Sequence, residues 1–497
     1  MKKSFTLFFL FTIFALTVFS QSLSFTPDIT ISSDEEIFAM GAGAEGKYAL
    51  DDNFTSRLLL DFAFNSKHFG FLAATSFRQD GVYAPDIANT PDGTLFNSYF
   101  TLDQGAMILK ALDMELQLGR ILQKDAIDSP YSLFISSKPN TPLLANFRYE
   151  NSFAFYETRW IELNTRSGVE TKAFSDGFPD RGAQLKTYGI KLGNMRFGLQ
   201  DGAVYTGRSF DLEYFVNPIP NYLIQYVKGT EGRPWTTGDN ENDIMGLFWD
   251  WKPNENLSFN AQLFVDDMSL LGIGNTSRNP WKTAYSLGGT IKTNFGSFSL
   301  HHALATKYCF STTSDRKEVA YPWAYYPDTR FPIKEGDYRA IPFETLMIGY
   351  YNGENNIAFR LDYENDFHGF KLLSNLEFVL SGDKSPGNAW HAGTWYDGPG
   401  TRLFDSEYLE KKFILSGQLS KQVHDFTFFS NFLIGFAINA LELQRPYPEG
   451  SESGVSEVYK DIDENVWIWR AGKSNELYFT LSLGFRYAIP IMNLFNK

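Results

Sequence analysis

The clearest alternation of apolar and polar residues lies near the end of the chain, between Leu477 and Tyr487. One face carries Leu477, Phe479, Leu481, Leu483, Phe485 and Tyr487, and the other carries Tyr478, Thr480, Ser482, Gly484 and Arg486. A period of two is that of a β-strand, whose successive side chains point to opposite faces of a sheet. The pattern therefore predicts a strand with one fully apolar face and one face that tolerates polar groups.

The same alternation recurs in several segments of about 10 residues, the length that a tilted strand needs to cross a bilayer. The clearest examples are residues 57–64, 69–77, 257–266 and 426–438, the last interrupted at Ser430. After the first 20 residues, no apolar run approaches the length of a membrane-spanning helix, which excludes a helical membrane protein. Strands that cross lipid must close into a barrel, because an open edge would leave backbone groups unpaired.

Short and long connections alternate between these segments, as they do in outer-membrane barrels with short periplasmic turns and long extracellular loops. Gly, Asn and Asp predict short turns at residues 112–114, 193–194, 253–256, 294–296, 352–355 and 423–425. The long stretches are residues 80–97, 123–144, 162–181, 205–243, 267–282, 308–341, 382–409 and 442–473. We predict an all-β, transmembrane antiparallel barrel of roughly 16–20 strands, with 18 favoured, whose long loops fold inward to narrow the lumen.

The first 20 residues have the pattern of a cleaved signal peptide. Lys2 and Lys3 precede an apolar run from Phe5 to Phe19, and Val18-Phe19-Ser20 suits a cleavage site. The alternative is an uncleaved anchor. We predict that residues 21–497 form a single barrel domain in the cell outer membrane. Its partners would then be membrane lipid, periplasmic chaperones and the barrel-insertion machinery.

Composition narrows the function further. The net charge of −14 argues against nucleic acid as a partner, because phosphates bind to basic surfaces. Cys309 is the single cysteine, so no disulfide can form within the chain. Aromatic residues make up 17% of the sequence, which suits the lipid face and interfacial girdles of a barrel.

The six histidines form no metal-binding or catalytic motif, and we predict no cofactor, no metal and no catalytic residue. An outer-membrane hydrolase stays a minor alternative, because the chain has many serines but no recognisable nucleophile motif. Asp266-Asp267 follows a clean strand and either binds a divalent cation or marks a solvated strand end.

Aromatic side chains in the long loops are the leading candidates for a binding site. Trp323 and Tyr325 lie in one such loop, and Trp395 lies in another among glycines. Aromatic rings stack on the apolar faces of sugars, while carboxylates such as Asp266 and Asp267 accept hydrogen bonds from hydroxyls. The alternative is that these rings pack the loops together or mark the membrane interface.

Two blocks of sequence carry a family resemblance. The first holds residues 118–120, 129–137 and Pro142, and the second holds residues 189–192, 197–202, 205, 214–218, 239–242 and 264–267. Together they resemble the Wzi-type capsule assembly family, in which a loop leads into a Leu-rich strand after a Gly-Arg element. The resemblance covers about a third of the chain, roughly residues 115–268. It implies an outer-membrane barrel that binds surface polysaccharide and helps attach it to the cell, with no catalytic role.

Two functions therefore stay open at this level. The first is a non-enzymatic barrel that binds, assembles or attaches surface polysaccharide, with Trp323, Tyr325, Trp395, Asp266 and Asp267 as candidate ligand residues. The second is a general or substrate-specific porin, whose acidic charge would favour cations or neutral solutes. A steady conductance across a planar bilayer would favour the porin.

Overall fold

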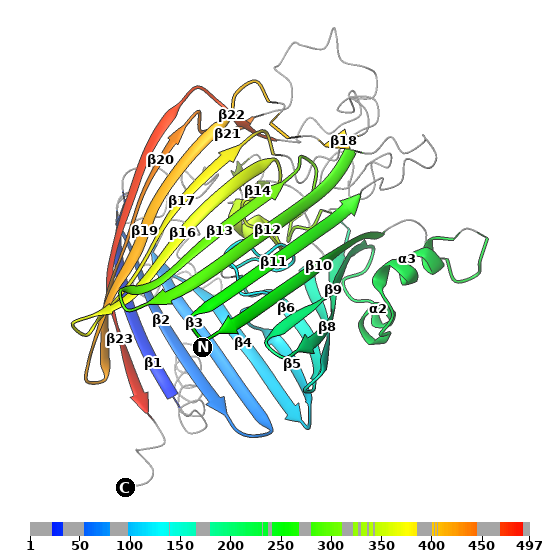
Figure 1. Cartoon of the computed structure of the whole chain (residues 1–497), viewed down its shortest axis with the longest axis horizontal. Coiled ribbons are helices and arrows are strands. Elements are labelled where there is room, and N and C mark those ends of the chain that lie inside the picture. The colour runs from blue at the N-terminus through cyan, green and yellow to red at the C-terminus, as the bar shows by residue number, and fades with distance from the viewer. Residues whose placement is uncertain are drawn as a thin grey trace.

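The first and last described strands pair with each other, and this pairing closes the sheet into a barrel (Figure 1). Ser22 of the first strand lies opposite Pro490 of the last. The computed structural model describes residues 22–32, 54–79, 98–138, 140–165, 179–230, 232–236, 241–267, 280–310, 322–326, 330–334, 337–340, 343–384, 400–401, 403–404, 406–444 and 468–490. The predicted signal peptide lies outside these residues and stays a prediction.

The barrel wall consists of 18 antiparallel strands within the described residues, which confirms the predicted fold class and strand number. They are β1 (Ser22–Ser32), β2 (Phe54–Asn65), β3 (Phe69–Gln79), β4 (Tyr99–Ala111), β5 (Met114–Arg120), β6 (Leu143–Glu150), β7 (Ala154–Asn164), β8 (Arg181–Leu192), β9 (Met195–Thr206), β10 (Glu241–Asn254), β11 (Leu257–Asp267), β12 (Pro280–Thr293), β13 (Gly296–Ala305), β16 (Asn356–Phe367), β17 (Phe370–Ser381), β19 (Glu410–Val423), β20 (Phe426–Ile438) and β23 (Asn475–Pro490).

Shorter elements lie in the connections between the wall strands. They are β14 (Arg330–Lys334), β15 (Asp337–Ala340), β18 (Gly400–Thr401), β21 (Leu441–Gln444), β22 (Ile468–Ala471), α2 (Leu212–Val216), α3 (Asn221–Gly229) and α4 (Phe343–Leu346). Among the described residues, no helix has the length and apolar character needed to cross a bilayer.

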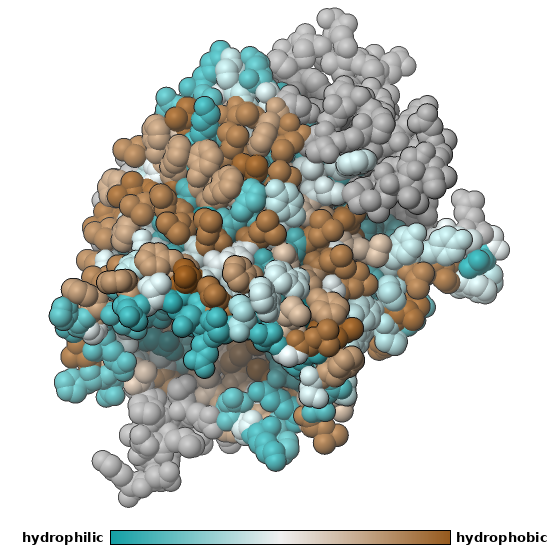
Figure 2. Space-filling view, in the orientation of Figure 1, coloured by the Kyte–Doolittle hydropathy of each residue, from teal (hydrophilic) through white to brown (hydrophobic). Residues whose placement is uncertain are grey.

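Alternate residues of the wall strands face outward and into the lumen, as the sequence pattern predicts. On β23, Leu477 and Leu483 are 68% and 54% exposed on the outer face. Ser482, between them, faces the lumen, and its hydroxyl lies 2.7 Å from the hydroxyl of Thr30 on β1. Apolar side chains cover the outer wall in Figure 2, as expected of a surface in contact with lipid.

The short connections join alternate pairs of wall strands and lie at the barrel end where β1 begins and β23 ends. Gly193 shows why such turns need glycine, because its positive φ of 59° is costly for a side chain with a Cβ. Five of the six predicted short turns join adjacent wall strands, from β4–β5 to β19–β20. This end of the barrel is the periplasmic one.

Residues 352–355 contain the positive backbone torsions of a turn, at Gly353 and Asn355, but the prediction that they join two strands as a hairpin is wrong. This segment precedes β16 at the end where the long connections lie, and it joins no pair of wall strands. Asn352 and Asn355 are 5% and 0% exposed, and the Asn355 amide donates a hydrogen bond to the carbonyl of Asp383. The Asn-Gly signal therefore marks a bend buried inside the protein.

A pair of helices lies outside the barrel, beside the wall formed by β7–β10 (Figure 1). We call the described residues between 207 and 236, which contain α2 and α3, the outer hairpin. Asp211 joins its two helices. One carboxylate oxygen accepts hydrogen bonds from the backbone N–H groups of Glu213 and Tyr214 at the start of α2. The other accepts from Arg208, and from Lys228 in α3 at 2.7 Å.

The contact between α2 and α3 in the outer hairpin should weaken in acid. Although burial opposes ionisation of Asp211, its hydrogen bonds and ion pairs with Lys228 and Arg208 hold its pKa below the usual range. The resulting stability is present above the unfolded pKa of about 4 and is lost as the pH falls through the folded pKa. At neutral pH, Asp211→Ala should remove the helix cap at a cost of about 0.5–2 kcal/mol. Limited proteolysis in detergent measures both effects.

Glu213→Ala is the matched control, because its carboxylate is 53% exposed and lies farther from Lys228, at 3.4 Å. The control should be cleaved as slowly as the wild type between residues 207 and 236. Equal cleavage of the Asp211→Ala variant and the wild type would show that Asp211 does not hold the hairpin.

Candidate functional site

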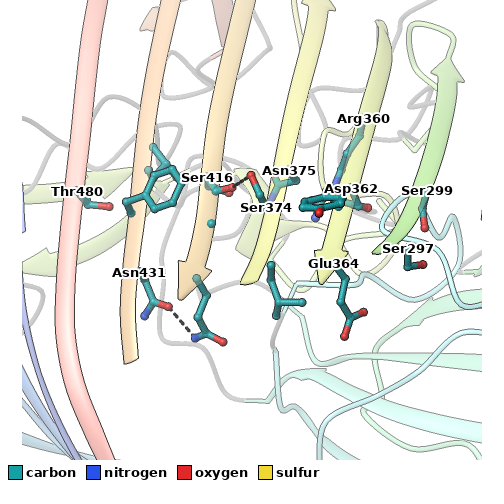
Figure 3. Close-up of a pocket in the computed structure, with 16 residues that line it drawn as sticks. Ser297, Ser299, Arg360, Asp362, Glu364, Ser374, Asn375, Ser416, Asn431 and Thr480 are labelled. Atoms are coloured by element: carbon teal, nitrogen blue, oxygen red, sulfur yellow. Dashed lines mark hydrogen bonds and ion pairs between the residues drawn. The ribbon is translucent and has the colours of Figure 1, made fainter. Parts of the chain in front are cut away.

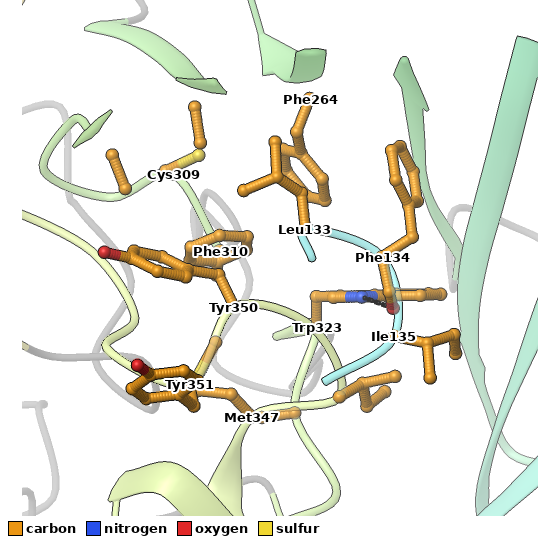
Figure 4. Packing of buried hydrophobic residues seen from close by; sticks show 14 of the residues in the cluster. Leu133, Phe134, Ile135, Phe264, Cys309, Phe310, Trp323, Met347, Tyr350 and Tyr351 are labelled. Atoms are coloured by element: carbon orange, nitrogen blue, oxygen red, sulfur yellow. Dashed lines mark hydrogen bonds between the residues drawn. The ribbon is translucent and has the colours of Figure 1, made fainter. Parts of the chain in front are cut away.

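Two long connections enter the lumen and pack together there (Figures 1 and 4). They are residues 121–142, between β5 and β6, and residues 306–355, between β13 and β16. We call their described residues the plug. Its buried apolar side chains include Tyr131, Leu133, Phe134, Ile135, Cys309, Phe310, Trp323, Met347, Ile348, Tyr350 and Tyr351. Two of the long loops therefore fold inward as predicted, whereas the described part of the loop at residues 205–243 forms the outer hairpin.

The plug packs against lumen-facing side chains of the wall strands from β7 to β17, including Leu185 of β8, Val204 of β9 and Phe264 of β11. The rings of Phe134 and Phe264 lie 5.0 Å apart between their centroids. These wall residues lie toward the ends of their strands that carry the long connections. The hydrophobic core of this protein is therefore inside the barrel, in its extracellular half.

The two plug segments also contact each other closely. A Cβ added to Gly349 would lie 1.9 Å from the carbonyl oxygen of Leu133, so the contact requires glycine. The backbone N–H of Ser136 donates to the carbonyl of Ile348 at 2.6 Å. The indole N–H of Trp323 donates to the carbonyl of Phe134 at 3.0 Å. The segments therefore fold as one unit.

Asp125 anchors the first plug segment to the wall. One carboxylate oxygen accepts from the backbone N–H groups of Phe134 and Ile135, both at 3.0 Å. The two oxygens also accept from the side-chain amides of Gln200 on β9, at 2.7 Å, and Gln262 on β11, at 3.1 Å. A charged acceptor makes stronger hydrogen bonds than a neutral one, so Asp125 holds the loop firmly against two strands.

Glu377 on β17 joins both plug segments to the opposite part of the wall. One of its oxygens accepts from the hydroxyls of Tyr131, at 3.0 Å, and Tyr351, at 2.7 Å, and from the amide of Asn352, at 3.2 Å. Burial and the Glu377 charge raise the pKa of Tyr131, which keeps its hydroxyl protonated and able to donate. Arg181 adds a third anchor through the carbonyls of Pro322 and Ala324.

Glu377→Ala should loosen the plug without unfolding the barrel. Three buried donors would lose their acceptor, and each unsatisfied group costs about 1–3 kcal/mol. We expect larger and noisier currents through the variant in planar bilayers than through the wild type. Glu377→Gln retains an acceptor oxygen and is the matched control, for which we expect intermediate currents. If Glu377→Ala and wild-type currents are the same, these hydrogen bonds do not hold the plug.

A polar cavity of about 580 Å³ lies in the lumen against β13, β16, β17, β19, β20 and β23 (Figure 3). Its polar lining residues are Ser297, Ser299, Arg360, Asp362, Glu364, Ser374, Asn375, Ser416, Gln418, Asn431 and Thr480. Asn431 also lines a second cavity of about 280 Å³, with Asp28, Arg57 and Arg78.

Charges in both cavities are mostly paired. Arg360 donates to Asp362 at 2.7 Å, and Arg57 lies 2.7 Å from Asp28. Hydroxyls, amides and paired charges form hydrogen bonds with neutral polar molecules. The lumen wall is therefore suited to sugars or other neutral solutes more than to an ion of one sign.

The candidate ligand residues that the structure describes have buried side chains. Trp323 and Tyr325 are 2% and 6% exposed within the plug, so in this conformation their rings pack the loops together. The Asp266 carboxylate lies 3.0 Å from the Lys282 ammonium, and this ion pair is buried. The backbone of Asp267 lies at a register shift in β11, and its side chain is outside the described residues. Trp395 is also outside them, so its role in binding stays a prediction.

The expected Leu-rich strand of the family resemblance is not found at residues 129–137, because this stretch is an irregular segment of the plug and the next strand, β6, begins at Leu143.

The sequence patterns did not predict that Asp125, Glu377 and Arg181 anchor the plug. The signal for Glu377 is a charge at a lumen-facing position between outward-facing Leu376 and Phe378.

No group of three or more His, Cys, Asp or Glu side chains in the described part of the chain is arranged to hold a metal ion. His301 and His302 face opposite sides of β13, as predicted. His301 lies 3.5 Å from Asp362 in the lumen, and His302 contacts Tyr285.

The closed wall, apolar outer face and polar lumen define the class: the chain is an outer-membrane β-barrel. No protein-family model and no curated protein matches the sequence. Among solved structures, the barrel is similar to Wzi, an outer-membrane protein involved in group 1 capsule assembly in Escherichia coli and a carbohydrate-binding β-barrel. The TM-score is 0.50 and the identity 10%, over 96% of this chain and 86% of that one.

Two Pseudomonas aeruginosa outer-membrane proteins give further matches. OprD has a TM-score of 0.44 at 11% identity, over 95% of both chains. OpdK has a TM-score of 0.43 at 11% identity, over 94% of this chain and 98% of that one. Identities this low show the fold alone.

Proposed function

We propose that this barrel binds surface polysaccharide, as capsule or exopolysaccharide, at its extracellular side and helps to assemble or attach it without catalysing a reaction. The observation that carries the proposal is the plug. Its buried core and its anchors Asp125, Arg181 and Glu377 make a rigid base in the extracellular half of the barrel. A binding protein benefits from such a base, because loops on a rigid scaffold hold a ligand with less loss of entropy.

Two further points support polysaccharide as the ligand. Residues 129–137 of the first sequence block with the Wzi-type resemblance lie in the plug, and residues 214–216 of the second lie in α2 of the outer hairpin. The barrel is also similar in fold to Wzi, a carbohydrate-binding β-barrel. We propose Trp395 and Asp267 as direct ligand contacts. Trp323, Tyr325 and Asp266 are buried and support the binding loops from within the barrel.

The proposal is tested by immobilising the folded barrel, passing surface polysaccharide extracted from the native cell envelope over it, and measuring how much polysaccharide is retained. We expect saturable retention that is lost when the barrel is unfolded and weakened by Trp395→Ala. Trp281→Ala is the matched control, because Trp281 lies on β12 with its side chain 37% exposed. Absence of retention by the folded protein would rule out the proposal.

The second candidate function is a channel for small solutes, and the polar lumen cavities favour it. A steady, large conductance of the wild-type protein in planar bilayers would support a channel, whereas brief or absent currents would support the binding protein. In either case we propose that periplasmic chaperones and the barrel-insertion machinery deliver the chain.

A further inference from the structure

Polar side chains occupy outward-facing positions of the wall where other strands present apolar residues to lipid. Asp201 lies six residues after Met195, which begins β9 next to a short turn. The residues six positions after the starts of β11 and β17 are Leu263 and Leu376, and their side chains are 38% and 52% exposed on the outer face. Counted from the periplasmic turns, Asp201 therefore lies at the depth of lipid-facing leucines.

Lys186 and Gln184 on β8 extend this polar surface. The strand pairing places Lys186 opposite Asp201 and Gln184 opposite Ala203, all on the outer face. Lys186, Gln184 and Asp201 are each 0% exposed. Charged side chains on the lipid face of a barrel cost about 2–4 kcal/mol for Lys or Arg at the midplane, so these residues need a cover.

The outer hairpin is that cover. The backbone N–H of Asn221 donates to the Asp201 carboxylate at 2.6 Å, and the Asn221 amide donates to the Asp201 carbonyl at 2.8 Å. The Lys186 ammonium donates to the carbonyl of Ile219 at 2.7 Å. Closer to the loop end of the wall, a Cβ on Gly182 would lie 2.1 Å from the carbonyl oxygen of Ser209, so the hairpin lies directly on the strands.

The side of the hairpin that faces the barrel is mixed, because buried polar side chains lie there beside Tyr214 and Ile224, which pack on Ala203 and Tyr205 of the wall, whereas the outward side is mostly apolar. Asn221, Lys228 and Asp211 are at most 8% exposed. The apolar side chains on the outside are Leu212, Val216, Ile219, Tyr222, Leu223 and Tyr226, which are 42–65% exposed. A helix on a soluble protein buries its apolar face, whereas this hairpin leaves most of its apolar side chains exposed.

We propose that the outer hairpin lies in the outer leaflet of the membrane, where its exposed apolar side chains contact lipid and its buried side shields Lys186 and Asp201. Its apolar side lies next to the lipid-facing wall, since α3 packs on β9 and β10, and Leu247 of β10 is 55% exposed. Tyr222, Tyr226 and Trp235 are aromatic anchors of the kind enriched at membrane interfaces. The inference is independent of the polysaccharide proposal.

Spin labels on single introduced cysteines in reconstituted barrels test this placement. Cys309 is fully buried in the plug and leaves the labelling of surface positions unaffected. The test variants are Leu223→Cys and Tyr226→Cys. Leu376→Cys reports the lipid-facing wall, and Ser482→Cys reports the lumen. Relaxation by oxygen, which concentrates in lipid, is compared with relaxation by a water-soluble nickel complex.

We expect the labels at residues 223 and 226 to be relaxed strongly by oxygen and weakly by nickel, as the label at residue 376 is. Accessibility to nickel equal to that of Ser482→Cys would place the hairpin in water and overturn the proposal. Dipolar broadening between labels at residue 226 would show a second copy of the chain on this face, and it would overturn the proposal as well.

Discussion

Leu481→Arg is expected to abolish assembly of the barrel, whereas Ser482→Arg, one residue away on β23, is expected to leave it intact. Leu481 faces outward, pairs with Ile31 of β1 and Phe432 of β20, and is 39% exposed to the region that lipid occupies. An arginine on the lipid face costs about 2–4 kcal/mol at the midplane and also removes the apolar contact of the leucine. The site lies in the strand that closes the barrel, so the loss acts on closure itself.

Ser482 faces the lumen and lines the cavity that contains Asp28, Arg57 and Arg78, where a longer polar side chain has room and a carboxylate nearby. The measurement is the fraction of each variant that migrates as a folded, heat-modifiable band after membrane extraction. We expect nearly complete loss for Leu481→Arg and wild-type levels for Ser482→Arg. Equal folding of the two variants would contradict the assignment of the two faces of β23.

Trp323→Ala is expected to open the plug while the wall remains folded. The Trp323 ring is 2% exposed in the plug core, and its indole donates to the carbonyl of Phe134. Truncating a buried Trp or Phe to Ala costs about 3–5 kcal/mol, which is large for a loop held by a few anchors. The wall does not depend on this core, because its backbone hydrogen bonds run from strand to strand around the closed barrel.

The expected result for Trp323→Ala is a folded, heat-modifiable barrel with a stepwise increase in single-channel conductance over the wild type. Trp281→Ala removes a tryptophan side chain from the extracellular end of β12, outside the plug, and should leave the conductance unchanged. If Trp323→Ala conducts no better than Trp281→Ala, then the plug does not close the lumen.

The sequence predicts the wall well and the interior poorly, for physical reasons. Leu477–Tyr487 and the other alternating segments are strands because lipid on one side and water on the other impose a period of two. The plug segment around Leu133 and Phe134 has no such period, because its irregular backbone is buried on all sides by the wall and by residues 306–355. Asn352-Gly353 has the composition of a surface turn, yet its bend is buried against β16.

The sequence contains a signal for the outer hairpin, which can be recognised once the strands are assigned. In the outward-facing series Phe197, Leu199, Asp201 and Ala203, a carboxylate interrupts the apolar positions. A charge at that depth requires a cover. In the stretch expected to be a long loop, Leu223, Tyr226 and Val227 have the spacing of one helical face. Neither pattern is sufficient alone, because which segment covers which strands is decided by packing.

The most direct test of the proposed function is the distribution of surface polysaccharide between cells and medium after deletion of the gene. If the barrel holds polysaccharide at the surface, the deleted strain should make the same total amount but release most of it into the medium. Expression of the wild-type chain should return it to the cells. An unchanged cell-bound fraction in the deleted strain would contradict the proposed function.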